Sequence, residues 1–363
     1  MRRLVTLDSL RGGLALYVVC YHFLATFPIL RESVDSHTLL FSHGSFAVDC
    51  FFVLSGFVMM YVYGNRFGQG LSKADLFEFF VARFARLYPV QIATFGLLLS
   101  WFFVTKGRHG EWESFLNSDG RYSWEAAVAN LVFLQGPWID HRTWNYPSWS
   151  LSAEWHAYVL FPLLVPVVRR LNNLVVAVAV ASAVPVGLYC WYQIEDIGTN
   201  GLISLLRVIP LFVIGMVAYR LRDQEWTGST SIVLLGTVGT LALLIIPRAW
   251  ILLPIAAPTL LFAALNENWF SRLLHARILV WLGEQSYSLY MIHALIQIFT
   301  TSILLPKLGF DSASISPMVG LWWVAVMIVV SLLVADQVRR WIEVPAREAI
   351  KQRARDKFVE AII

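Results

Sequence analysis

The sequence predicts an all-α polytopic membrane protein of about ten transmembrane helices, and three observations lead to this fold class. Only 14% of the 363 residues are charged and 58% are hydrophobic, whereas a soluble domain usually carries about 25% charged residues. Tryptophan (15) and phenylalanine (24) are plentiful. The apolar residues also gather into long runs. These features argue against a soluble enzyme, a disordered chain and a disulfide-stapled domain.

Ten apolar segments are long enough to cross a bilayer, which needs about 20 residues. Basic residues set the orientation, because cytoplasmic loops carry an excess of lysine and arginine. With a cytoplasmic N-terminus and ten crossings, 20 of the 28 lysines and arginines fall on the cytoplasmic side and seven on the outer side. The expected spans are 12–30, 44–64, 88–105, 149–168, 173–191, 203–220, 231–247, 249–265, 278–301 and 318–338.

A shorter apolar stretch, 125–139, contains Asn130 and Pro137. Counting it as a full crossing would move Arg169 and its neighbour outside and reverse every later loop. We therefore interpret 106–148 as one outer segment, in which 125–139 re-enters the bilayer or lies on its surface. Irregular backbone at membrane depth needs protein or water around it, so we expect this segment to cover a cavity.

No linker or internal repeat divides the chain, so residues 1–363 are expected to form one domain. The tail, 339–363, is interpreted as a basic helix on the cytoplasmic surface, and the alternative is a solvated tail whose positive charge only sets the orientation. A net charge of only +4 and the lack of a basic aromatic platform argue against nucleic acid as a partner. The three cysteines, Cys20, Cys50 and Cys190, lie in apolar runs and match no metal-binding spacing, so no metal is expected.

Arg11 and His22 are the first polar candidates, because both belong to the first apolar helix. Eleven residues on an α-helix return to nearly the same face and rise about 16 Å along the axis. One face would thus carry an arginine at the cytoplasmic mouth and a histidine in the outer half. The alternative is an arginine that sets orientation and a hydrogen-bonded core histidine.

Four further charged or titratable residues fall at a similar depth to His22, in the outer half of other spans: Asp49, Glu154, Arg207 and His293. Such residues inside a membrane usually face the bundle interior and mark functional sites. A carboxylate beside a histidine fixes its tautomer and raises its basicity, as a general base requires. The same set could instead relay protons or ions in a transporter.

Arg83 and Arg86 are three residues apart, which places both guanidinium groups on one helix face. Two adjacent arginines suit a polyanion such as phosphate. The alternative is ordinary positive charge flanking a membrane helix. The sequence has no P-loop, serine-hydrolase or zinc-protease motif.

Seven short blocks in order along the chain resemble the acyltransferase-3 family of bacterial and animal integral-membrane acyltransferases. The blocks are Leu7-Asp8-Ser9-Leu10-Arg11-Gly12 through His22; Asp49-Cys50-Phe51-Phe52-Val53-Leu54-Ser55-Gly56-Phe57; Arg83-Phe84-Ala85-Arg86-Leu87-Tyr88-Pro89; Trp149-Ser150-Leu151-Ser152-Ala153-Glu154-Trp155 with Tyr158; Arg207-Val208-Ile209-Pro210-Leu211-Phe212 with Gly215; Gly283 with Ser286-Tyr287-Ser288-Leu289-Tyr290 and His293; and Glu343-Val344-Pro345-Ala346-Arg347.

The resemblance implies ten helices and transfer of an acyl group, commonly acetyl from acetyl-CoA, to a hydroxyl of a carbohydrate outside the cytoplasmic membrane. It implies catalytic importance for Arg11 and His22, and a donor-binding role for Arg83 and Arg86. Members often carry a fused esterase-like domain after an extra helix, and at this length we expect the stand-alone form.

Both lines of reasoning join in one hypothesis. Acetyl-CoA binds from the cytoplasm, with its phosphates at Arg83 and Arg86 and with Arg11 at the mouth. Its uncharged pantetheine arm threads between helices toward His22, the general base. Asp49 or Glu154 would orient the imidazole, with His293 in the same catalytic set.

Substrate binding is assigned to Arg207, Trp149 and Tyr287, and the aromatic residues of the outer segment would stack on the carbohydrate acceptor. The alternative is that these aromatic residues anchor the protein at the membrane interface. The expected location is a bacterial cytoplasmic membrane with both termini in the cytoplasm. A proton-coupled carbohydrate exporter or flippase is the alternative function. The identity of the acceptor, the acyl length and the oligomeric state stay open.

Overall fold

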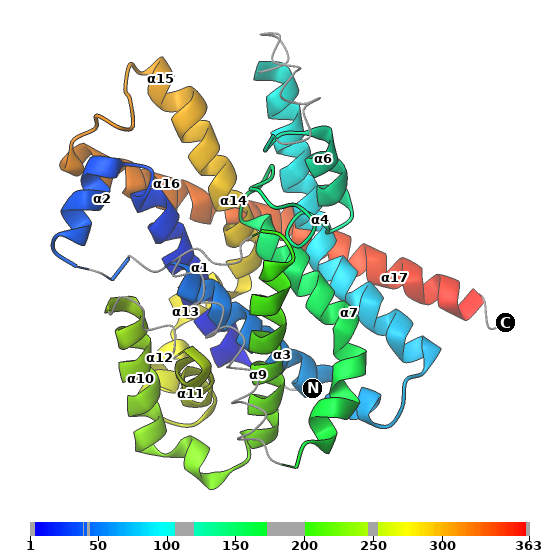
Figure 1. Ribbon diagram of the computed structural model, residues 1–363. Coiled ribbons are helices and arrows are strands. Elements are labelled where there is room, and N and C mark those ends of the chain that lie inside the picture. Colours follow the sequence, from blue (N-terminus) through cyan, green and yellow to red (C-terminus); the bar gives the residue numbers. More distant parts are fainter. Residues whose placement is uncertain are drawn as a thin grey trace.

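The computed structural model describes residues 4–38, 40–41, 44–105, 120–172, 200–245 and 253–360, and this part of the chain is helical without any β-strand (Figure 1). The α-helices are α1 (Val5–Leu24), α2 (Pro28–Asp35), α3 (Ser45–Gly68), α4 (Lys73–Thr105), α6 (Trp124–Leu131), α7 (Ser148–Arg170), α9 (Ile203–Leu221), α10 (Thr230–Ile245), α11 (Leu253–Leu265), α12 (Trp269–Leu274), α13 (Arg277–Glu284), α14 (Ser286–Phe299), α15 (Leu305–Lys307), α16 (Pro317–Val338) and α17 (Val344–Glu360). A 3₁₀ turn, η2 (Glu225–Gly228), and two π-helical turns, η4 (Thr300–Leu304) and η5 (Arg339–Glu343), complete the order.

Six of the described helices are long and apolar enough to cross a membrane, or seven if α1 and α2 count as one bent span. Two shorter apolar helices, α10 and α11, occupy two more of the expected positions. The expected span 173–191 lies outside the described residues. The all-helical membrane fold is therefore confirmed, while the count of ten stays a prediction.

The first expected span, 12–30, is wrong in its boundaries. Helix α1 already begins at Val5 and ends at Leu24, and α2 then turns away by 118°. Pro28 is the first residue of α2, and Phe27 before it is extended (φ −119°, ψ 94°). A proline disfavours helical backbone at the preceding residue, so the chain breaks there although it stays apolar.

Two other boundaries also differ from the expected spans. Helix α4 starts at Lys73, well before 88–105, and continues through Pro89. The expected span 278–301 is divided at Gln285, whose backbone (φ −100°, ψ 4°) separates α13 from α14. The division turns the short α13 against α1, where it helps to form the wall of the site described below.

Glycines allow the backbones of neighbouring helices to meet. A Cβ atom added to Gly215 of α9 would lie 1.9 Å from the carbonyl oxygen of Val53 on α3, and one added to Gly56 of α3 would lie 1.9 Å from the carbonyl oxygen of Phe212. Small residues at such crossings let membrane helices pack closely. This contact fixes α3, a main wall of the site, against α9.

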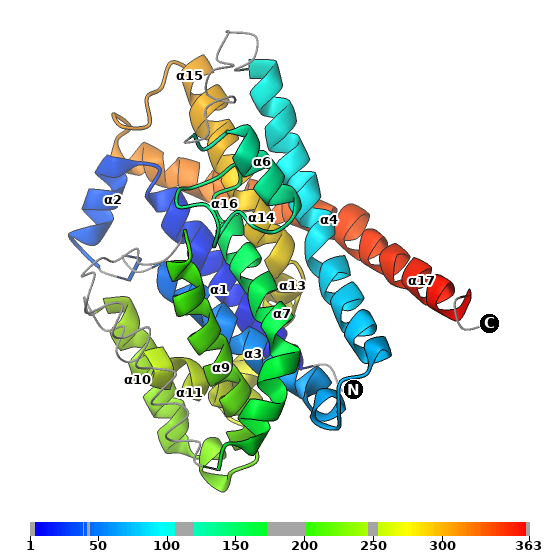
Figure 2. The ribbon, with the colours of Figure 1, turned by 45° about the vertical axis from the view of Figure 1, so that its right-hand side comes forward.

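The described part of the outer segment, 120–147, packs over the ends of α4 and α14. Its helix α6 is capped by Ser123, whose side chain accepts a hydrogen bond from the amide of Ala126. Trp144 is fully buried against Phe95 and Phe102 of α4. In both views α6 lies beside the upper part of α4, whereas α17 projects away from the bundle (Figures 1 and 2).

Candidate active site

A cavity of about 240 Å³, the central cavity, lies between α1, α3, α4, α7 and α14. Its α3 wall is mostly apolar and runs from Val48 to Val62. Its polar residues are Asp8, Arg11, Ser55, Arg83, Arg86, Ser150, Glu154, Tyr158, Ser286, Tyr287 and Tyr290. The cavity is thus charged along one part and apolar along another.

A second cavity of about 310 Å³, the mouth cavity, adjoins the first and is lined mainly by charged residues. The two cavities share Asp8, Arg11, Arg86, Ser286 and Tyr287. The mouth cavity adds acidic and basic side chains from the end of α13, from η5 and from α17: Glu284, Arg339, Glu343 and Arg347. The two cavities are therefore adjacent, and together we call them the path.

Three arginines face this path without a fixed anionic partner. Arg11, Arg83 and Arg86 form no hydrogen bond or ion pair with any residue that the structure describes. The guanidinium of Arg83 lies over the rings of Tyr63 (5.6 Å) and Tyr158 (5.8 Å), and its buried Nε has no hydrogen-bond partner in the described part of the chain. Converging guanidinium groups with open donors suit a bound polyanion.

Glu154 lies in the central cavity and is held by two hydroxyls. The Ser55 hydroxyl donates to its Oε1 at 2.6 Å, and the Tyr158 hydroxyl donates to the same oxygen at 2.5 Å. Tyr158 follows Glu154 by one helical turn, so the helix itself brings the two together. The carboxylate therefore faces the arginines of the cavity from a fixed position.

Asp49 is paired with Arg207 in a buried, two-pronged ion pair. Arg207 donates from Nε to Oδ1 at 2.7 Å and from Nη2 to Oδ2 at 2.8 Å, and both side chains are buried. The guanidinium also lies 5.8 Å from the ring of Trp149. The structure thus joins three predicted residues from α3, α7 and α9 into one cluster, beside the lining of the central cavity.

His22 and His293 meet outside the cavity linings, where His293 packs beside Tyr290. Their rings stack with centroids 5.3 Å apart. Tyr146 of the outer segment packs edge-on against both rings, at 4.9 Å from His22 and 6.0 Å from His293. His293 is fully buried, and neither of its ring nitrogens has a hydrogen-bond partner among the described residues.

The expectation that Asp49 or Glu154 lies against His22 is not met. No hydrogen bond or ion pair joins either carboxylate to His22 within the described chain, because Asp49 is taken by Arg207 and Glu154 by two hydroxyls. The predicted single polar layer is instead divided into an ion pair, a carboxylate in the cavity and a pair of histidines. The chemical roles of these residues stay predictions.

The outer segment fixes the surroundings of His22. The Tyr146 hydroxyl donates to Oε1 of Gln297 at 2.6 Å, and Nε2 of Gln297 donates to the backbone carbonyl of His22 at 3.1 Å and to the hydroxyl of Thr26 at 2.8 Å. Burial raises the pKa of the Tyr146 phenol, so it stays protonated and can donate this bond. The outer segment therefore locks α1 to α14 beside the histidines.

Tyr287, Tyr290 and His293 follow one another at intervals of three residues on α14 and connect the cavity with the histidines. Tyr287 donates to the carbonyl of Leu87, and both tyrosines line the central cavity. The Tyr290 hydroxyl donates to the carbonyl of Pro147 at 3.1 Å, and its ring centroid lies 5.7 Å from that of His293. Tyr290 thus stands between the end of the cavity and the histidine pair.

Sequence reasoning did not assign a role to several residues of the path: Asp8, Ser55, Tyr158, Tyr290 and Glu343. Helical spacing could have identified some of them. Asp8 precedes Arg11 by three residues and Tyr290 follows Tyr287 by three, so each shares a face with an assigned residue.

The structure describes no group of three or more histidine, cysteine, aspartate or glutamate side chains that could hold a metal ion.

Comparison with known proteins shows which family the chain belongs to. The family model of the acyltransferase-3 domain, described as an acyltransferase domain, matches residues 4–336. The chain is 27% identical over 337 residues to acyltransferase MdmB of Streptomyces mycarofaciens, covering 85% of this chain and 82% of that protein. It is 23% identical over 382 residues to O-acetyltransferase OatA of Staphylococcus aureus, covering 96% of this chain and 58% of that protein. No solved structure matches the chain.

Proposed function

Since this chain belongs to the acyltransferase-3 family and is an integral-membrane O-acyltransferase, we propose that it takes an acyl group from acyl-CoA at the cytoplasmic side. The acceptor is a hydroxyl of a carbohydrate or glycoconjugate at the outer face, and the acyl group is acetyl. We place the protein in a bacterial cytoplasmic membrane with both termini in the cytoplasm, in accord with its basic residues.

The observation that carries the donor proposal is the open state of Arg11, Arg83 and Arg86. Buried or half-buried cations are normally paired, because an uncompensated charge is unfavourable away from water. Three of them line the central cavity without a hydrogen bond or ion pair to the described chain. The phosphates of acyl-CoA would pair with the open donors of these arginines, while its pantetheine arm carries no charge and suits the apolar wall.

The length of the cavity agrees with an extended arm. The α3 residues that line it run from Val48 to Val62. At 1.5 Å per residue this wall is about 21 Å long. A donor held by the arginines could therefore place its thioester near Tyr290, next to the histidine pair.

His22 is the proposed general base. It removes the proton of the acceptor hydroxyl as that oxygen attacks the thioester carbonyl carbon. The tetrahedral intermediate then collapses with cleavage of the carbon–sulfur bond, and the proton passes from His22 to the departing thiolate of CoA. The products are an ester and free CoA, and His22 returns to its neutral form.

The acceptor side rests on the position of Tyr146 and on the relatives. The outer segment brings this tyrosine, with its hydrogen-bonded Gln297, to the ring of His22. O-acetyltransferase OatA is named for O-acetyl transfer. Aromatic side chains of the outer segment offer faces on which a sugar ring could stack, so a carbohydrate hydroxyl is the proposed nucleophile.

The proposal is tested with purified protein in liposomes that contain a surface glycan from the producing cell. Transfer of label from radioactive acetyl-CoA to the glycan, lost in the Arg83→Gln/Arg86→Gln double variant, is the expected result. Movement of glycan across the bilayer without use of acetyl-CoA would instead support the alternative function, a carbohydrate exporter or flippase. Comparing acetyl groups on surface glycans with and without the gene identifies the acceptor.

A further inference from the structure

A third cavity of about 510 Å³ lies between α4 and α17, and we call it the α4–α17 cavity. The α4 side supplies residues of its first three turns and Arg83, and α17 supplies Lys351, Ala354 and Arg355. Helix α17 leaves the bundle beside α4 in both views (Figures 1 and 2). None of the expected site residues except Arg83 belongs to this cavity.

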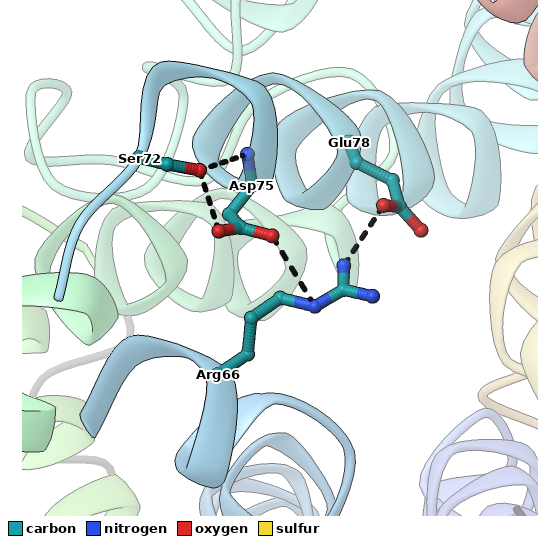
Figure 3. A network of polar contacts seen from close by, with 4 residues as sticks. All are labelled: Arg66, Ser72, Asp75 and Glu78. Carbon is teal, nitrogen blue, oxygen red and sulfur yellow. Dashed lines mark hydrogen bonds and ion pairs between the residues drawn. The ribbon is translucent and has the colours of Figure 1, made fainter. Parts of the chain in front are cut away.

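The two acidic residues of the cavity are both paired with one arginine. Arg66 at the end of α3 approaches Asp75 (Nε to Oδ1, 3.3 Å) and Glu78 (Nη1 to Oε2, 2.8 Å), as Figure 3 shows. The Ser72 hydroxyl also donates to Asp75, at 2.5 Å. One arginine from outside the cavity lining therefore holds both carboxylates that line it.

The basic residues of the cavity are not neutralised in the same way. Arg355 has no hydrogen bond or ion pair within the described residues, and Lys351 has only a long contact of 3.9 Å to Glu348. Arg83 and Arg355 both lie within electrostatic reach of Lys351. Three like charges gathered at one cavity repel one another, and a bound anion would remove that repulsion.

Arg83 connects this cavity with the central cavity, because it lines both. Its Nε is buried and has no hydrogen-bond partner among the described residues. An anion beside Arg83 in the α4–α17 cavity would therefore be one side chain away from the path that leads to the histidines. The remaining lining is mostly apolar, with Tyr63, Phe77, Val81 and alanines. Phe77 is 45% exposed, so its ring can accept the flat face of a purine base.

We propose that the α4–α17 cavity binds the 3′-phosphoadenosine end of the acyl-CoA donor, with Lys351 and Arg355 on the 3′-phosphate. The inference rests on the proposed function, since it assumes acyl-CoA as the donor. The diphosphate then lies at Arg83 and Arg86, and the pantetheine arm enters the central cavity. Arg66 serves the site indirectly, because it keeps Asp75 and Glu78 from repelling the phosphate.

Calorimetric titration of purified protein in nanodiscs with acetyl-CoA and with 3′-dephospho-acetyl-CoA tests the assignment without an acceptor. Lys351→Gln and Arg355→Gln should each raise the dissociation constant for acetyl-CoA by about five- to tenfold, as loss of a charge-assisted contact does. Neither should change the constant for the dephospho form. The matched control is Arg353→Gln, an exposed α17 residue outside the cavity, which should bind both ligands like the unaltered protein.

Arg66→Gln gives an independent test through charge alone. Freeing the two carboxylates should weaken acetyl-CoA binding about fivefold, and adding Asp75→Asn and Glu78→Gln should restore it. Unchanged acetyl-CoA binding in Lys351→Gln and Arg355→Gln, or equal losses for both ligands, would overturn the assignment. Failure of the unaltered protein to bind either ligand would instead remove acyl-CoA as the donor.

Discussion

The centroids of the imidazole rings of His22 and His293 lie 5.3 Å apart, and the ring planes are inclined by only 24°. They come from α1 and α14, and the outer segment seals them with Tyr146. His293 is fully buried with both nitrogens unsatisfied in the described structure. A native protein rarely keeps such a group without a functional reason.

Replacing His22 by glutamine tests the base. The amide keeps a hydrogen-bonding side chain but cannot accept the acceptor proton, so kcat should fall by roughly 10²- to 10⁴-fold. Acetyl-CoA binding should change little, because His22 lies beyond the arginines of the cavity. Turnover like that of the unaltered protein would exclude His22 as the base.

His293→Leu should make the protein more stable and less active at the same time. Removing two unsatisfied buried nitrogens should stabilise the fold by about 1–2 kcal/mol, while kcat falls at least tenfold if His293 belongs to the catalytic set. Thermal unfolding and single-turnover assays measure the two effects. The control is His275→Leu on α12, which removes a 2.8 Å hydrogen bond between its ring and the Ser271 carbonyl and should lower stability without affecting turnover.

Arg86→Lys separates phosphate binding from membrane orientation. Lysine keeps the charge that orients a helix, but it lacks the planar fork of arginine. Losing one charge-assisted contact should cost about 1.5–3 kcal/mol, or roughly tenfold or more in the apparent KM for acetyl-CoA. If Arg86→Lys and Arg83→Lys both leave the affinity for acetyl-CoA unchanged, the two arginines serve only to orient the helix in the membrane.

Gly215→Ala should destabilise the bundle, because its methyl group would collide with the carbonyl oxygen of Val53 on α3. Forcing the two helices apart should cost about 1–3 kcal/mol. The matched substitution is Gly96→Ala on α4, where nothing lies within 4 Å and where alanine should stabilise the helix by up to about 1 kcal/mol. Thermal unfolding in detergent should give shifts of opposite sign, and equal shifts would contradict the close contact.

Single cysteines test the orientation in a protein whose three native cysteines are replaced. A cysteine at Asp140, which is 94% exposed, should react with an impermeant thiol reagent from outside intact cells. One at Asn172, beyond the end of α7, should react only after permeabilisation. Labelling of Asn172 from outside, together with protection of the cysteine at Asp140, would mean that segment 125–139 crosses the membrane.

The sequence predicted best what depends on one helix alone. The spacing of Arg11 and His22 along α1 follows from helical geometry, and the structure places the first in the lining of the cavity and the second against His293. The apolar runs likewise predicted the membrane helices. The break before Pro28 had a visible signal, but the continuous apolar run concealed it.

Partnerships between helices could not be predicted in the same way. Depth in the membrane follows from the sequence, but the direction in which a side chain points depends on how the helices cross. Asp49, Glu154 and His293 were therefore expected together with His22, yet only His293 reaches it. The pairing of Asp49 with Arg207 and of Glu154 with Ser55 depends on the packing of α3 against α9 and α7.

The π-helical turn η5 has a consequence for how sequences of this kind can diverge. A π-helical turn contains one residue more than an α-helical turn. In η5, Glu343 points inward and accepts a hydrogen bond from the Ser288 hydroxyl at 2.7 Å. Deleting one residue between Arg339 and Glu343 would rotate all of α17 by about 100°. Lys351 would then turn away from α4, so natural variation in this turn should consist of substitutions, with single-residue gaps confined to variants that have lost the α4–α17 cavity.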